Sequence, residues 1–221
     1  MSIFDILLRY RDALAAGLLV TLRLAIVAWL AGLCVGIIVG ALAHRWPRLV
    51  GVPLRVLAFL LSGVPFLVLL YWAHYPLQEI LRVVVDPFIT SATLLSLINI
   101  VAVGEVWRGA LDDFRQEYRN AALVCGLTTF EVLRYVQIPL VLRQALPMLL
   151  GIQVLILQTT LFTSLISVQE LFRVTQEINS TIYRPIEIYS ALAILFVVVC
   201  VPIYATAILL RRKYTRNLSE R

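Results

Sequence analysis

The sequence is poor in charged residues, which a water-soluble protein needs to cover its surface. Only 14% of its 221 residues are Asp, Glu, Lys or Arg, whereas 61% are hydrophobic. So little polar side chain cannot cover so much apolar side chain, and this excludes a soluble domain. The composition predicts an integral membrane protein.

Catalytic and metal-binding patterns are also missing. The three cysteines, Cys34, Cys125 and Cys200, lie in separate segments and form neither a disulfide framework nor a ligand cluster. His44 lies beside an arginine and His74 lies among aromatic residues, which favours roles at the membrane interface over metal binding. There is no nucleophile elbow and no His-Glu-x-x-His pattern. The sequence therefore predicts neither an enzyme nor a metalloprotein.

Five segments contain no charged residue over the length that a bilayer requires, about 17 to 25 residues per helix. They are Leu24–Ala43, Val56–Gln78, Pro87–Gly104, Gln144–Gln169 and Ile188–Leu210. With their flanking residues they predict five transmembrane helices, over about 13–43, 54–78, 87–108, 144–169 and 188–211. The expected fold is a single all-α transmembrane domain that spans residues 1–221.

The distribution of basic residues predicts how the chain is oriented. Thirteen of the nineteen lie in three segments: three in 44–55, five in 105–143 and five from residue 211 onwards. Basic residues favour the cytoplasmic side, so these segments should be cytoplasmic, with the N-terminus outside and the C-terminus inside. The net charge of +6 then indicates this topology and contact with anionic lipid. No nucleic-acid partner is expected, because no basic patch is interleaved with aromatic residues.

The polar loop at about 112–143 is longer than a turn between two membrane helices, which indicates a docking surface for a soluble partner. Residues 114–125 predict a helix that ends at Gly126. Thr128 and Glu131 form a capping box that predicts a second helix. We expect Pro139 to end that second helix.

The second helix of the loop carries an apolar stripe at helical spacing. Its members are Phe130, Leu133, Val136 and Leu140. Such a stripe can insert into a groove on a partner, or it can pack beneath the chain's own transmembrane helices. The spacing alone leaves both alternatives open.

The loop resembles a known motif. Ala121-Ala122, then Gly126, then Val136-x-Ile138-Pro139 match the spacing of the EAA motif in permease subunits of ABC importers. Further segments are similar to the polar amino acid branch of that family, the histidine/glutamine permease type. They are Glu105–Gly109, Arg143–Pro147, Ser164–Leu171 and Arg184–Tyr189. The resemblance extends over about residues 17–213.

This resemblance implies a subunit of a type I importer in a bacterial inner membrane. Two permease subunits would form the pathway, two ATPase subunits would bind their cytoplasmic loops, and a periplasmic or lipid-anchored solute-binding protein would deliver a polar amino acid or related compound. The chain has no phosphate-binding loop and only one lysine, Lys213, so ATP and Mg²⁺ should bind to the ATPase and this chain should carry no cofactor. The residues expected to couple it to the ATPase are Asn120, Ala121, Ala122, Gly126, Phe130, Glu131 and Pro139.

The sequence departs from the family pattern at charged positions. Asn120 stands where the family has Glu, Leu61–Pro65 where it usually reads Phe-Arg-Gly-Thr-Pro, and Gln158–Leu161 where it reads Lys-Asp-Thr-Ser. Gly63 and Pro65 are still expected to weaken the second helix and free backbone groups that line a cavity. The candidate substrate-pathway residues are Ser62, Gly63, Pro65, Gln158, Thr159 and Thr160.

An amino acid needs a cation for its carboxylate and an anion for its amine, and these positions supply neither. Either the chain is the less ligand-contacting half of a heterodimer, or its neutral groups recognise the substrate. A self-sufficient secondary transporter or channel is a further alternative. It is less favoured, because the five segments have no ionisable residue except near the edges, at Arg23 and Glu105.

Overall fold

The computed structural model describes residues 3–216, and every regular element within them is helical. Four continuous helices are long and apolar enough to cross a membrane. The first comprises α2 (Arg11–Ala31), the π-helical η1 (Gly32–Gly36) and α3 (Ile37–Arg45), and the second is α7 (Pro87–Asp112). The third comprises α9 (Thr129–Glu131), the π-helical η3 (Val132–Gln137), α10 (Ile138–Thr159) and the 3-10 helix η4 (Thr160–Ile166). The fourth is α12 (Pro185–Arg216).

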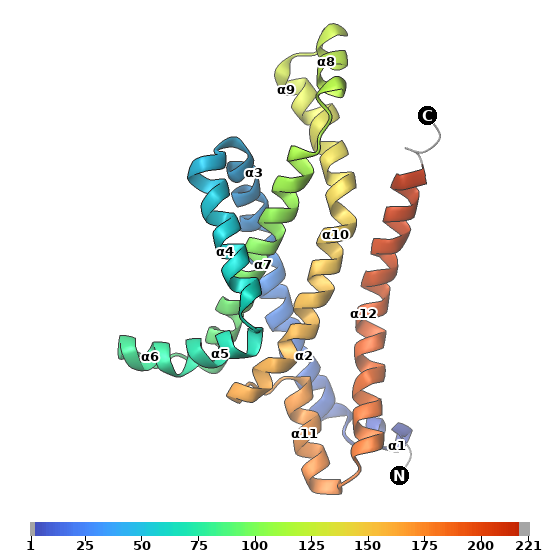
Figure 1. Ribbon diagram of the computed structural model, residues 1–221. Coiled ribbons are helices and arrows are strands. Elements are labelled where there is room, and N and C mark those ends of the chain that lie inside the picture. The colour runs from blue at the N-terminus through green and yellow to red at the C-terminus, as the bar shows by residue number, and fades with distance from the viewer. Residues whose placement is uncertain (1–2, 217–221) are drawn as a thin grey trace.

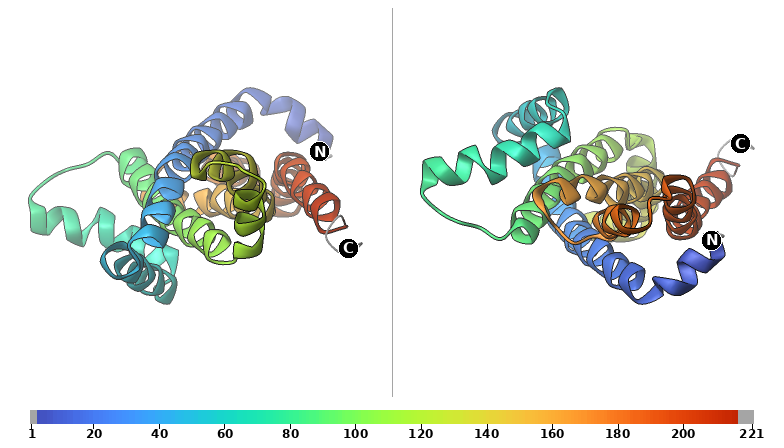
Figure 2. Two further views of the ribbon diagram at one scale, coloured as in Figure 1. Left: turned by 90° about the horizontal axis from the view of Figure 1, so that it is seen from above. Right: turned by 90° about the horizontal axis from the view of Figure 1, so that it is seen from below.

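The second predicted span, over 54–78, is broken. η2 (Pro47–Gly51) and α4 (Val52–Gly63) are separated from α5 (Phe66–His74) and α6 (Pro76–Leu81) by a bend of 97°. The span predicted over 54–78 is therefore two helices and not one, and it breaks at Gly63 and Pro65, where weakening was predicted. Pro65 has no backbone N–H and disfavours helical geometry in the residue before it, and Val64 is extended, with φ −112° and ψ 127°. Beyond the break, α5 packs against α7 and η4, with Leu70 fully buried, and α6 extends away from the other helices (Figures 1 and 2).

The short helices lie at the two ends of the bundle. α1 (Ile3–Arg9) and α11 (Leu171–Ile182) lie at one end, and α8 (Gln116–Val124) lies with α9 at the other (Figure 1). The turn between α3 and α4 and the C-terminal part of α12 also point towards the α8–α9 end. The three segments richest in basic residues are therefore directed to the same end of the molecule.

Three glycines bring α2 and α3 into backbone contact with α7. A Cβ atom at Gly32 would lie 2.2 Å from Nδ2 of Asn99, one at Gly36 would lie 2.8 Å from the Ile100 carbonyl oxygen, and one at Gly40 would lie 2.5 Å from that of Gly104. None of these distances leaves room for a side chain. Small residues at four-residue spacing allow membrane helices to approach closely, because lipid offers little hydrophobic drive for their association.

A buried polar group joins three transmembrane helices at the level of Gly32. Asn99 on α7 donates from Nδ2 to the Ala28 carbonyl oxygen on α2, at 2.8 Å, and to Oε1 of Gln153 on α10, at 2.9 Å. Trp29 donates its indole N–H to the Gln153 carbonyl oxygen at 2.9 Å. Asn99 and Gln153 are both buried, so these bonds satisfy amides that would otherwise be unpaired in an apolar interior.

Replacement of Gly32 by Ala should destabilise the protein by roughly 2 kcal/mol, because the new methyl group must displace Asn99 from its hydrogen bonds. Thermal unfolding of the purified protein in one detergent measures the effect. Gly151→Ala is the matched control, since a Cβ there meets nothing within 4 Å and alanine favours a helix. Equal melting temperatures for the two variants would contradict the close contact.

Candidate functional site

The segment between α7 and α10 forms a corner of two helices that is fixed by local hydrogen bonds. α8 ends where the N–H of Gly126 donates to the Leu123 carbonyl oxygen and that of Leu127 donates to the Ala122 carbonyl oxygen. This Schellman pattern requires a left-handed residue, and Gly126 has φ +87°. A Cβ at Gly126 would meet nothing within 4 Å. Within this subunit, glycine is therefore required for backbone conformation, and space around it is open.

The second helix of the corner begins with the predicted capping box. The backbone N–H of Thr128 donates to Oε2 of Glu131 at 2.8 Å, and the backbone N–H of Glu131 donates to Oγ1 of Thr128 at 3.4 Å. Two free amides at the helix start are thereby satisfied. The prediction of this capping box is confirmed.

Pro139 does not end the second helix as predicted. The chain continues through η3 into α10 and stays helical to Ile166, whereas the sequence predicted a new helix from about residue 144. Pro139 stands in the first turn of α10, directly after the wider π-helical turns of η3. The π-helical turns before Pro139 alter the regular hydrogen bonding of the helix there, so that the helix continues although proline lacks an N–H. The corner is thus joined to a transmembrane helix without a break.

The apolar stripe of the corner is divided between two environments. Phe130 is 67% exposed and Leu133 is 41% exposed, whereas Val136 and Leu140 pack against the buried cluster at the base of the loop. That cluster includes Phe114, just after α7, together with Trp107 of α7 and Val141 of α10. The inner half of the stripe therefore packs beneath the chain's own helices, and the outer half is exposed and can contact a partner.

The helix break exposes one set of candidate pathway residues. Ser62, Gly63, Val64 and Pro65 are all exposed, and open space surrounds Gly63. The Ser62 hydroxyl lies within hydrogen-bonding distance of the carbonyl oxygens of Ala58, at 2.8 Å, and Phe59, at 3.1 Å. The break therefore presents backbone together with one small hydroxyl side chain.

The second set lies where α10 changes to the 3-10 turn η4. Gln158 is exposed, and the Thr159 hydroxyl donates to the Leu155 carbonyl oxygen at 2.7 Å. Thr160 is fully buried and donates to the Leu157 carbonyl oxygen, so its side chain holds the turn. Next to the two sets, Phe66 of α5 packs against Phe162 of η4, with ring centroids 6.0 Å apart.

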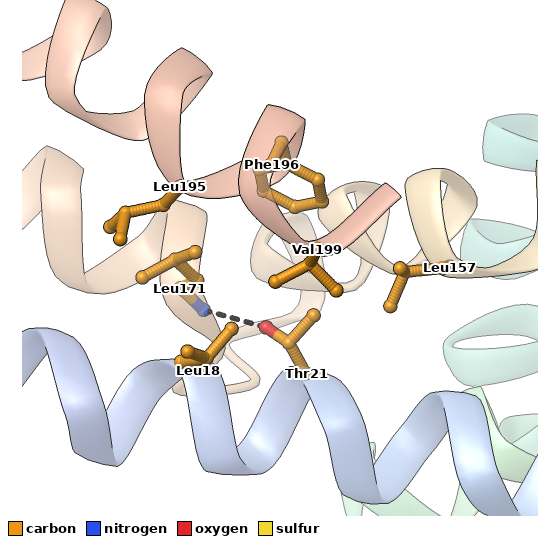
Figure 3. Close-up of a pocket in the computed structure, with 7 residues that line it drawn as sticks. All are labelled: Leu18, Thr21, Leu157, Leu171, Leu195, Phe196 and Val199. Atoms are coloured by element: carbon orange, nitrogen blue, oxygen red, sulfur yellow. Dashed lines mark hydrogen bonds between the residues drawn. The ribbon is translucent and has the colours of Figure 1, made fainter. Parts of the chain in front are cut away.

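A buried carboxylate at the other end of the bundle was not singled out from the sequence. Glu170 is fully buried and caps α11, accepting from the backbone N–H groups of Phe172 and Arg173, both at 2.8 Å. The adjacent Leu171 donates its N–H to Oγ1 of Thr21 on α2, at the edge of a small apolar pocket (Figure 3). An acidic residue just before a strongly amphipathic helix is a capping signal, but burial of its carboxylate depends on α2.

Metal ligands are not gathered anywhere in the described part of the chain. Within residues 3–216, no group of three or more His, Cys, Asp or Glu side chains is placed to hold an ion. His44 and His74 instead bond to Asp112 and to Gln78 and Thr90, respectively.

Comparison with known proteins identifies the family of the chain. Residues 32–216 match the family model described as binding-protein-dependent transport system inner membrane component. The glutamine transport system permease protein GlnP of Escherichia coli K12 is 30% identical over 188 residues, which cover 84% of this chain and 85% of that protein. The histidine/lysine/arginine/ornithine permease protein HisQ of the same strain is 26% identical and covers 93% of this chain and 95% of its own.

Solved structures have the same fold. An amino acid ABC transporter crystallised with histidines superimposes with a TM-score of 0.82 and 22% identity, over 95% of this chain and 98% of that chain. The MetNI methionine ABC transporter in an inward-facing conformation superimposes with a TM-score of 0.68 and 17% identity, over 93% and 97%. The expected fold, that of a type I ABC importer permease, is confirmed.

Glu170 predicts a pH dependence of stability. Burial raises the pKa of its carboxyl from 4.5 to about 7, although two backbone amides bond to the ionised form. The folded state therefore holds this proton more tightly than the unfolded state, and the resulting stabilisation is complete below pH 4.5 and lost as the pH rises through 7. It amounts to about 3 kcal/mol.

Glu170→Gln should remove this contribution, so that its melting temperature in detergent falls less than that of the wild type between pH 5 and pH 8. The control is Glu177→Gln on the same helix, whose exposed carboxylate pairs with Arg173. An unchanged pH profile for Glu170→Gln would argue against the raised pKa.

Proposed function

Because the chain belongs to the family of binding-protein-dependent transport system inner membrane components, it is a permease subunit of an amino acid ABC importer, and we propose that its 112–143 loop couples it to a separate ATPase. Importers of this family work with ATPase and solute-binding partners. This chain has no phosphate-binding loop, so ATP and Mg²⁺ bind to the ATPase and no cofactor binds here.

The α8–α9 corner is the observation that carries this proposal. It is shaped by its own hydrogen bonds, presents Phe130 and Tyr135 at 67% and 64% exposure, and continues directly into α10. A rigid corner transmits the movement of a docked ATPase to a transmembrane helix, as a shift between two states that the nucleotide favours unequally. Asn120, Ala121 and Ala122 lie on α8 within this surface, and the exposed Asn120 lacks the charge of the family's Glu.

The proposed orientation places the corner in the cytoplasm, with the N-terminus outside and the C-terminus inside. The clustering of basic segments towards one end of the bundle supports it. Two ATPase subunits then engage the loops of two permease subunits. A periplasmic or lipid-anchored solute-binding protein delivers the substrate at the end where α1 and α11 lie.

The substrate pathway runs past the break at residues 63–65 and the turn at 158–160. Both segments are uncharged, and Ser62, Gln158 and Thr159 offer only neutral groups there. The charges that bind a polar amino acid are therefore supplied by a different, second permease subunit. The names of the relatives, which concern glutamine, histidine, lysine, arginine, ornithine and octopine, support the substrate class.

Mass spectrometry of the intact complex, purified through this chain with its native neighbours, tests the assembly. We expect two ATPase subunits, this chain and a second, different permease. Two copies of this chain with the ATPase would retain the importer but assign recognition to the neutral residues. A complex without ATPase, in detergent shown to preserve such assemblies, would favour a self-sufficient transporter.

Gly126→Val should uncouple transport, because a β-branched residue cannot adopt φ +87° without strain and the corner would lose its shape. Substrate uptake should fall about five-fold or more while membrane insertion is unchanged, since a strain of about 1–3 kcal/mol is involved. Gly126→Asn is the matched control, because asparagine tolerates this conformation. Wild-type uptake by the valine variant would defeat the proposed role of the corner.

A further inference from the structure

Four ionisable side chains form a continuous chain between α7 and α3 at the base of the loop. Arg108 donates to Oε2 of Glu105 at 2.8 Å and to Oδ2 of Asp112 at 2.6 Å. The other oxygen of Asp112, Oδ1, lies 2.6 Å from Nδ1 of His44, in the last turn of α3. Glu105, Arg108 and Asp112 are three and four residues apart on one face of α7, so the His44 contact carries the chain to a second helix.

The neighbouring carboxylate bonds in the opposite direction. Asp113 accepts from Nε2 of Gln144 on α10 at 3.3 Å. The last residue of α7 and the residue after it are thus linked to α3 on one side and to α10 on the other. The loop that ends in the α8–α9 corner starts at these two residues.

A surface ion pair ordinarily contributes little, because water screens it and two flexible side chains must be ordered. The four side chains from Glu105 to His44 differ from such a pair, because their neighbours already hold them in place. The His44 and Asp112 side chains are 38% and 44% exposed, but the Arg108 side chain is only 20% exposed and both Asp112 oxygens are occupied. The contact of Gly40 with the Gly104 backbone already holds α3 against α7, so His44 reaches Asp112 without a large loss of entropy.

α3 in turn is packed to the helix that ends at the break. Ala43 of α3, Leu54 of α4 and Val101 of α7 form one buried cluster. A Cβ at Gly51, in the turn before α4, would lie 3.0 Å from the Ala43 carbonyl oxygen. α3 is therefore in close contact with η2, the turn that leads into α4, and α4 leads to residues 63–65.

We propose that His44 is a positioning residue for ATP-driven transport: its bond to Asp112 passes movement of the 112–143 loop, through α3 and α4, to the break in the substrate pathway. The proposal rests on the proposed function of that loop. Asp112 links the two helices, since its carboxylate bonds to Arg108 on its own helix, α7, and to His44 on α3. Without the imidazole, the loop still contacts the ATPase, but the last turn of α3 is no longer fixed to the last turn of α7.

Three substitutions separate this bond from a role of the ring at the membrane interface. His44→Ala removes both the ring and the donor. His44→Phe keeps an aromatic ring at the interface but cannot bond to Asp112. His44→Asn loses the ring but places an amide N–H as many bonds from Cα as Nδ1, so it restores the bond. Asp12→Asn is the control at the opposite end, where Asp12 pairs with Arg11 in an exposed contact.

The full complex with its native partners, reconstituted in liposomes, is assayed for substrate uptake and for ATP hydrolysis. We expect the amount of substrate moved per ATP to fall by up to about five-fold in His44→Ala and His44→Phe, as for loss of a solvent-exposed ion pair. His44→Asn should retain most of the wild-type ratio, and Asp12→Asn all of it. In an Asp112→Ala background, His44→Ala should have no further effect.

A wild-type ratio in His44→Phe, or an equal loss in His44→Asn and His44→Ala, would overturn the role of the bond. If the alanine variant fails to assemble, the comparison of phenylalanine with asparagine still decides. Failure of the proposed function is distinguishable, because the wild-type complex itself would then show no ATP-dependent uptake.

Discussion

The backbone contact between α2–α3 and α7 is the constraint on which the other features depend. It is made by Gly32, Gly36 and Gly40, where no side chain fits between the helices. At this distance Asn99 can reach both the Ala28 carbonyl oxygen and Gln153, and His44 can reach Asp112. Specific polar contacts in a membrane protein require such close approach, since amides and carboxylates are short and unpaired ones are costly.

The molecule also separates two kinds of irregular helix. The break at Val64 and Pro65 opens the backbone and turns the chain by 97°. The π-helical segments η1 and η3 instead preserve continuity, since helix runs through both. π-helical turns often occur at functional sites, and η3 joins the exposed corner to α10. One irregularity therefore exposes polar backbone at the helix break, and the other keeps the α8–α9 corner continuous with α10.

Local signals in the sequence were the reliable ones. The charge-free segments predicted the membrane helices, and Thr128 with Glu131 predicted the capping box, because both depend on residues near each other in the chain. The continuation past Pro139 was missed because it depends on a π-helical turn that no residue pattern announces. The pairing of Asn99 with Gln153 and the burial of Glu170 could not be predicted, since each partner lies on a distant helix.

The glycine contact has a consequence for how this sequence can vary. A buried leucine can change to isoleucine or methionine at modest cost, but every replacement of glycine adds at least a Cβ atom. No other amino acid lacks a Cβ atom, so this helix pair cannot change by small steps. A change at Gly32, Gly36 or Gly40 requires a compensating retreat on α7 at the same time. On the lipid-facing surface, by contrast, one apolar residue can replace another, and sequence divergence should accumulate there.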